Sequence, residues 1–219
     1  MKKNLILTLV FVSCASAPTA PTATAPAITP APAPATDRAH FADIDHPRVD
    51  YHLTRFTGEK RAEFASYLQR KSDYEQMIRA KLRRRGMPEE LLYLAMVESG
   101  FNPTVHSLQE AVGIWQLVPD TARRYGLRVD ATVDERTDAE KSTDAALSYL
   151  SYLYNRFGSW YLAAAAYNAG ENRISRVMEK GTDADYFRVW DQLPGETRDY
   201  VPAMIAAMRI ARDPSRYGF

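Results

Sequence analysis

The sequence predicts an all-α globular domain over residues 58–219, preceded by a signal peptide over residues 1–14 and a disordered tether and lead-in over residues 15–57. Three observations predict this fold class. Apolar residues recur at three- and four-residue spacing in segments such as DAALSYLSYLYNRF. Prolines and glycines that suit helix starts and ends separate these segments. No segment shows the convincing alternation of apolar and polar residues that is typical of a strand.

The first 14 residues have the features of a secretory signal: two lysines, a short apolar run over residues 5–12 and small residues after it. The run is too short to span a membrane. It ends in FVSC at Cys14, the single cysteine of the chain, and this sequence resembles the lipobox of bacterial lipoproteins. Cys14 is therefore the predicted lipidation site, with the protein anchored to the outer membrane and facing the periplasm. Ordinary signal cleavage after Ala15 or Ala17 is the alternative.

Residues 15–36 consist almost entirely of Ala, Pro, Thr and Ser. Such a segment has little apolar mass to bury, so we expect it to stay extended and solvated. In polyproline geometry, at about 3.1 Å per residue, it would reach roughly 60 Å. We therefore interpret it as a spacer that carries the domain away from a membrane surface, and we assign the polar residues up to position 57 to the same lead-in.

Capping residues predict the helix boundaries of the domain. The S/T-x-x-E boxes that begin at Ser72 and Thr137 predict two helix starts. Pro88 and Pro119 suit first-turn positions. Three glycines suit helix ends: Gly86, Gly158 and Gly181.

Glu98 is a carboxylate on the apolar face of a predicted helix, in the segment PEELLYLAMVESGFNP. Leu91, Leu94 and Ala95 precede it by seven, four and three positions, so the four side chains share one stripe. Burial disfavours the charged form of a carboxyl group and raises its pKa, which can supply a proton donor near neutral pH. The alternative is a solvated glutamate in the last turn of a helix.

The segments after Glu98 predict a loop followed by further helices. Gly100 and Pro103 break the helix, and we expect residues 100–118 to fold back over its end. A short helix begins at Pro119, and a long one from about Thr137 leads to the apolar segment SWYLAAAAYNAGEN. Tyr167 and Asn168 are the conspicuous polar groups at the end of that segment.

Together these motifs resemble those of the lytic transglycosylases, in the family that includes goose-type lysozymes, over nearly all of residues 60–219. The matching residues are the pair Glu98 and Ser99, the loop residue Ser107, the element from Gly113 to Gln116, the sequence AYNAG from Ala166 to Gly170, and the closing residues Glu196, Thr197, Tyr200, Val201 and Pro202. Trp115, in place of the usual Met, and the closing residues are most similar to a membrane-bound group within the family. The resemblance implies a lysozyme-like helical domain with a binding cleft.

The resemblance also implies an activity: cleavage of the β-1,4 bond between N-acetylmuramic acid and N-acetylglucosamine in peptidoglycan glycan strands, with formation of 1,6-anhydromuramic acid ends. Glu98 would act first as acid and then as base, and no cofactor would be needed. Five side chains would bind the substrate or support its binding: Ser99, Ser107, Gln116, Tyr167 and Asn168.

Two alternatives stay open at this point. A lysozyme-like hydrolase of the same bond needs a second carboxylate, for which Glu110 and Glu171 are the candidates. A non-catalytic peptidoglycan-binding lipoprotein is the other alternative. The formal net charge of +1 gives no support to nucleic-acid binding. We expect no metal site, because the histidines lack suitably spaced partners: they are His40, His46, His52 and His106.

Overall fold

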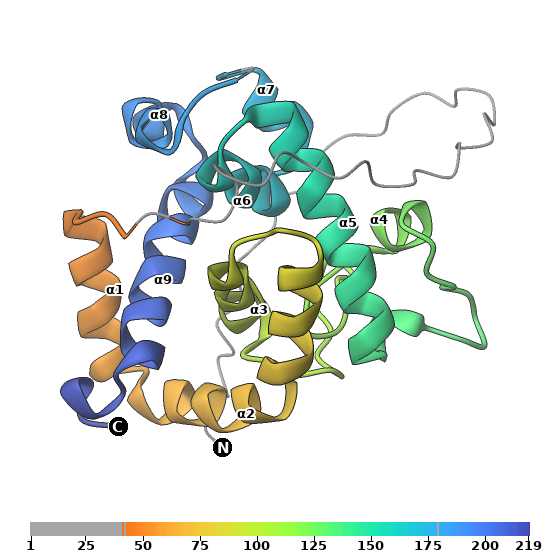
Figure 1. Ribbon diagram of the computed structural model, residues 1–219, viewed down its shortest axis with the longest axis horizontal. Coiled ribbons are helices and arrows are strands. Elements are labelled where there is room, and N and C mark those ends of the chain that lie inside the picture. The colour runs from red at the N-terminus through yellow and green to blue at the C-terminus, as the bar shows by residue number, and fades with distance from the viewer. Residues whose placement is uncertain (1–40, 42, 179) are drawn as a thin grey trace.

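The computed structural model describes residues 41, 43–178 and 180–219, and these residues form an all-helical globular domain (Figure 1). The predicted signal peptide, Cys14 and the Pro-rich tether lie outside the described residues. In chain order, with 3₁₀ helices written η, the elements are α1 (Pro47–Thr57), α2 (Arg61–Arg84), η1 (Glu89–Leu91), α3 (Leu92–Ser99), α4 (Pro119–Arg124), η2 (Glu135–Thr137), α5 (Ala139–Phe157), α6 (Trp160–Ala169), α7 (Glu171–Ser175), α8 (Asp183–Arg188), η3 (Trp190–Gln192), α9 (Gly195–Arg212) and η4 (Ser215–Tyr217).

Two apolar helices, α3 and α6, form the centre of the core. All side chains over residues 92–97 and 160–166 are buried. A helix that is apolar on every side is stable only when other elements surround it. Accordingly, α3 packs against α2 and α9, and α6 packs against α5 and α9 (Figure 1). The four consecutive alanines of α6 allow this close packing, because they add little volume to the helix surface.

The end of α3 is fixed by Gly100, which adopts a φ of +57°. A Cβ atom at this position would lie 2.1 Å from a ring carbon of Tyr67, so only glycine fits. The chain then returns over the end of α3, as the sequence predicts. Short bridges between His106 and Val112 and between Val112 and Leu117 give this returning loop its shape.

A buried arginine holds the loop in place from the other side. The Arg136 guanidinium donates to the carbonyl oxygens of Glu110, at 2.5 Å, and Leu117, at 3.0 Å. It also forms an ion pair with Asp134 at 2.7 Å. Gly113 approaches the same residue, because a Cβ atom on it would lie 2.1 Å from the Arg136 carbonyl oxygen. The loop therefore has little freedom near the end of α3.

Some of the predicted helix boundaries are confirmed. Pro119 is the first residue of α4. Gly158 ends α5 with a φ of +74°, and Gly86 follows the end of α2 with a φ of +61°. Pro88 directly precedes η1. The prediction for Gly181 is wrong, since this residue lies between α7 and α8 rather than at the end of either helix.

Both predicted capping boxes are wrong. Ser72 lies inside α2, which runs unbroken over 24 residues, and its hydroxyl donates to the Gln69 carbonyl of the same helix. A serine within a helix commonly makes such a local bond. The N-cap of α5 is Asp138, one residue after Thr137, and its carboxylate accepts from the backbone N–H groups of Glu140 and Lys141. An aspartate is a strong N-cap and replaces the expected threonine.

The prediction of a disordered lead-in up to residue 57 is also partly wrong. Residues 47–57 form α1, which packs along α9 (Figure 1). Val49, His52 and Phe56 are buried on one face of α1. Arg48 adds an ion pair with Asp199 of α9 at 2.5 Å. The folded domain therefore begins before residue 58. Across the described ranges, the structure contains no helix that is long and apolar enough to span a membrane.

Candidate active site

Glu98 is the penultimate residue of α3, where the buried helix meets the returning loop. The Tyr200 hydroxyl of α9 donates a hydrogen bond to Glu98 Oε1 at 2.5 Å. Burial raises the pKa of Glu98 to about 8, the Tyr200 hydrogen bond works against this rise, and the charge of Glu196 adds to it. Part of the residue stays accessible. A pKa of about 8 keeps the carboxyl group mostly protonated at neutral pH.

Two tyrosines from different helices flank this carboxyl group. Tyr200 is 1% exposed and contacts Glu98 directly. Tyr167 of α6 donates its hydroxyl to the carbonyl oxygen of Trp115 at 2.7 Å. Its pKa is raised well above the ordinary range by burial and then by the charge of Glu98. The site thus joins α3, α6 and α9 with the loop element that contains Trp115.

Ser99 and Gln116 hold the loop against α3. The Ser99 hydroxyl donates to the Ile114 carbonyl at 2.9 Å and accepts from the Asn102 backbone N–H at 3.2 Å. The Gln116 amide nitrogen donates to the carbonyls of Gly113, at 2.9 Å, and Val105, at 3.2 Å. These bonds form within the protein, and the predicted contact of either side chain with substrate stays a prediction.

Ser107 and Asn168 also have partners within the protein. The Ser107 hydroxyl accepts from the backbone N–H groups of Gln109 and Ala111, at 3.2 and 3.0 Å. Asn168 is 5% exposed, and its Oδ1 accepts from the Thr197 hydroxyl at 3.0 Å. Among the residues that the structure describes, nothing accepts from its buried Nδ2. Asn168 therefore links α6 to the first turn of α9, and the substrate role of both residues stays a prediction.

The carboxylate whose charge raises the pKa of Glu98 is Glu196. It is neither of the two candidates that the sequence suggested. Glu110 is exposed on the loop, and Glu171 is held by Tyr149, at 2.9 Å, and Arg124, at 3.2 Å. Burial favours a higher pKa for Glu171, but its hydrogen bonds and the Arg124 charge lower the pKa overall. Glu196 instead contributes to the raised pKa of Glu98, and burial raises its own pKa.

Sequence reasoning named Glu196 and Tyr200 as motif residues but gave them no role in the site. A signal was present, because the two residues are four positions apart and so share one face of a helix. What the sequence could not supply was the direction of that face. In the described part of the chain, no group of three or more His, Cys, Asp or Glu side chains is arranged to hold a metal ion.

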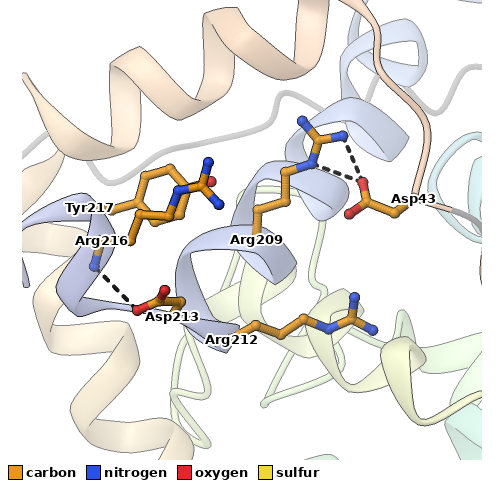
Figure 2. A pocket seen from close by; sticks show the side chains of 6 residues that line it. All are labelled: Asp43, Arg209, Arg212, Asp213, Arg216 and Tyr217. Carbon is orange, nitrogen blue, oxygen red and sulfur yellow. Dashed lines mark hydrogen bonds and ion pairs between the residues drawn. The ribbon is translucent and has the colours of Figure 1, made fainter.

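A separate hollow lies at the C-terminal end of α9 (Figure 2). Its lining residues are Asp43, Arg209, Arg212, Asp213, Arg216 and Tyr217. Arg209 forms ion pairs with both Asp43 and Asp45 at 2.7 Å, and Arg212 forms one with Glu90 at 2.7 Å. Carboxylates thus already match these guanidinium charges. The lining includes none of the side chains around Glu98, and we place the candidate active site at Glu98.

Comparison with known proteins identifies a matching family and several similar proteins. A family model described as the transglycosylase SLT domain matches residues 75–188. Membrane-bound lytic murein transglycosylase D of Escherichia coli (strain K12) is 40% identical over 154 residues, which cover 68% of this chain and 34% of that protein. A peptidoglycan transglycosylase of Escherichia phage T7 is 37% identical over 147 residues, which cover 65% of this chain and 11% of that protein. The chain thus spans about a third of the length of the Escherichia coli relative.

Solved structures share the fold. The 70-kDa soluble lytic transglycosylase in complex with bulgecin A has a TM-score of 0.53 and 25% identity, over 64% of this chain and 24% of that one. The lytic transglycosylase Slt of Pseudomonas aeruginosa has a TM-score of 0.52 and 23% identity, again over 64% of this chain and 24% of the other. The predicted all-helical, lysozyme-like fold class is confirmed.

Proposed function

Because the chain belongs to the SLT transglycosylase family, we propose that it cleaves the β-1,4 bond between N-acetylmuramic acid and N-acetylglucosamine in peptidoglycan and leaves 1,6-anhydromuramic acid ends. The observation that carries the proposal is the Glu98 carboxyl group, which has a pKa of about 8 and is directly hydrogen-bonded by Tyr200. The relatives named as murein and peptidoglycan transglycosylases support the substrate class.

The proposed reaction uses one carboxyl group twice. Glu98 first donates its proton to the glycosidic oxygen, the bond from C1 to that oxygen breaks, and N-acetylglucosamine leaves with a free 4-hydroxyl. The N-acetyl group of the muramoyl residue stabilises the cationic sugar. The Glu98 carboxylate then takes the proton of the C6 hydroxyl, whose oxygen attacks C1 and closes the anhydro ring. Glu98 ends protonated again, and no water is consumed.

Tyr200 has a defined part in this cycle. Its hydroxyl donates to Glu98 Oε1, and a donor of this kind favours the charged form of a carboxyl group. It therefore stabilises Glu98 most strongly between the two steps, when the group is a carboxylate. A fixed donor aimed at developing charge is an efficient way to lower a reaction barrier.

A lysozyme-like hydrolase is the second candidate, and Glu196 is the observation that favours it. A hydrolase needs a second carboxylate to activate water or to attack the sugar, and Glu196 is close enough for its charge to raise the pKa of Glu98. The charge of Arg173 opposes the rise in the pKa of Glu196. In this reaction the cleaved muramic acid would end in a reducing sugar that contains oxygen from water. A non-catalytic role is less consistent with the site, because a buried acid carries a cost in stability.

Digestion of purified sacculi in heavy-oxygen water separates the candidates. We expect soluble muropeptides with anhydro ends and no label by mass spectrometry. Glu98→Gln keeps the shape of the side chain and loses the proton, so the rate should fall at least ~10²-fold. Glu196→Gln is the matched control and should retain the anhydro product. Labelled reducing ends that disappear with Glu196→Gln would establish the hydrolase instead, and full activity of Glu98→Gln would refute both schemes.

We further propose that Cys14 is lipidated and that the Pro-rich tether joins an outer-membrane anchor to the domain. The support is the sequence FVSC and the composition of residues 15–36, together with a relative whose name says that it is membrane-bound. Cys14→Ser should move the protein out of the membrane fraction, or block its processing, while the purified domain keeps its activity. A fully processed Cys14→Ser protein that stays in the membrane fraction would contradict the anchor.

A further inference from the structure

Pro202 interrupts the hydrogen-bond pattern of α9 just after Tyr200. A proline inside a helix has no N–H to donate to the carbonyl four residues earlier, which here is the carbonyl of Arg198. A buried carbonyl without a donor costs free energy. The Arg198 carbonyl therefore lacks the donor that the helix would normally supply.

Two side chains from the segment before α9 provide donors at this position. The Trp190 indole N–H of η3 donates to the Arg198 carbonyl at 2.8 Å. The Tyr186 hydroxyl of α8 lies 3.2 Å from the same oxygen and 3.0 Å from the carbonyl oxygen of Thr197. Tyr186 thus contacts two successive carbonyl oxygens of α9 just before Pro202.

Both side chains are firmly placed. Tyr186 is fully buried and packs edge-on against the rings of Tyr161 and Phe187. The Trp190 ring lies beneath the Arg198 guanidinium, whose central carbon is 5.2 Å from the ring centroid. The turn of α9 that precedes Pro202 therefore contacts firmly packed groups.

We infer that Tyr186 and Trp190 are positioning residues, which hold the turn of α9 before Pro202 so that the Tyr200 hydroxyl points at Glu98. Tyr200 lies between the bound carbonyls of Thr197 and Arg198 and the proline. A change in the backbone of this turn would therefore alter the direction of its side chain. The inference rests on the proposed function for its effect on catalysis, but its effect on Glu98 itself can be measured without any substrate.

Tyr186→Phe and Trp190→Phe each remove one donor and keep an aromatic ring. If the Tyr200 hydroxyl moves away, the Glu98 carboxylate loses its donor, so the pKa of Glu98 rises. Carbon-13 NMR of the Glu98 carboxyl group should show its titration at a higher pH in each variant of the full chain. On sacculi, kcat should fall about 3- to 10-fold, the effect of weakening one hydrogen bond, with KM within about twofold and the alkaline limb of the pH profile moved upward.

Tyr67→Phe is the matched control, because it removes a hydroxyl that donates to Glu63 within α2. Glu98 should titrate in this variant as in the parent. Pro202→Ala adds a backbone N–H that can reach the Arg198 carbonyl, so Trp190→Phe should lower Tm less in that background than in the parent background. This result would show that the indole replaces the bond that proline removes.

The inference is overturned if Tyr186→Phe and Trp190→Phe lower Tm but leave the Glu98 titration and the pH profile at the parent values, since both residues would then only stabilise the fold. If the parent itself releases no muropeptides, the proposed function fails, while the carboxyl titrations still decide whether the two residues position Tyr200.

Discussion

Replacing Glu98 with glutamine should stabilise the protein by an amount that grows with pH. Burial gives the folded carboxyl group a pKa of about 8, whereas its ordinary value is 4.5. Between these values the folded state binds a proton that the unfolded state has released. The free energy of unfolding of the parent therefore falls as pH rises through this window. Glutamine cannot ionise, so the variant does not suffer this loss.

The pKa difference sets the size of the effect. One pKa unit corresponds to about 1.4 kcal/mol, so the advantage of the variant grows by up to that amount per pH unit and has a ceiling of about 5 kcal/mol above pH 8. Glu98 keeps some accessible surface, and solvent screening reduces the electrostatic cost. We therefore expect an increase of about 1–3 kcal/mol in the advantage of the variant between pH 5 and pH 8.

The assay must separate the effect of Glu98 on the free energy of unfolding from that of His52, whose effect has the opposite pH dependence. Burial lowers the pKa of His52 to about 4, so the unfolded chain takes up a proton first as pH falls from 6.5. His52 thus makes stability rise with pH between about 4 and 6.5. Urea unfolding of parent and variant at pH 5, 6, 7 and 8, followed by circular dichroism, cancels this contribution in the difference. A difference that stays constant over the series would refute the raised pKa of Glu98.

Three further substitutions test other contacts. Tyr200→Phe removes the donor to Glu98, the proposed acid and base. On sacculi, kcat should therefore fall about tenfold and the alkaline limb of the pH profile should move upward. Gly113→Ala combines a positive φ with a Cβ atom 2.1 Å from a carbonyl oxygen, so the free energy of unfolding in urea should fall by at least ~3 kcal/mol. The control is Gly126→Ala, where the added atom meets nothing, and its loss should be ~1 kcal/mol. Arg48→Met removes a cation that lowers the pKa of His52, so NMR of the imidazole should show titration above the parent value; an unchanged titration would contradict this contact.

The local parts of the site were predictable from the sequence. The stripe that contains Glu98 follows from helical spacing alone, because the helix is short and almost wholly apolar. The returning loop follows from Gly100 and Pro103, since both residues end helices. These signals lie within a few residues of the features that they predict, and the burial and raised pKa of Glu98 agree with them.

Long-range partners were not predictable in the same way. Tyr200 and Glu98 are 102 positions apart, and nothing in a helix pattern states which face of α9 meets α3. The apolar face of α1 consists of a few residues among many polar ones, so its pattern was too short to indicate a helix. Its ion pair with Asp199 spans 151 positions. Ser72 is a local signal that misled, because its capping motif lies inside α2, which runs on past it.

The packing of α1 on α9 also bears on where this chain can be cut without uncovering its core. A fragment that starts at residue 58 loses Arg48, the ion-pair partner of Asp199, and uncovers the ring of Phe64, which stacks on Phe56 at 4.8 Å. Asp199 directly precedes Tyr200, whose hydroxyl donates to Glu98. Fragments cut at the edge of the family match, residue 75, would in addition divide α2. The family match begins at residue 75, but the folded chain that packs on α9 begins some 30 residues earlier, at α1.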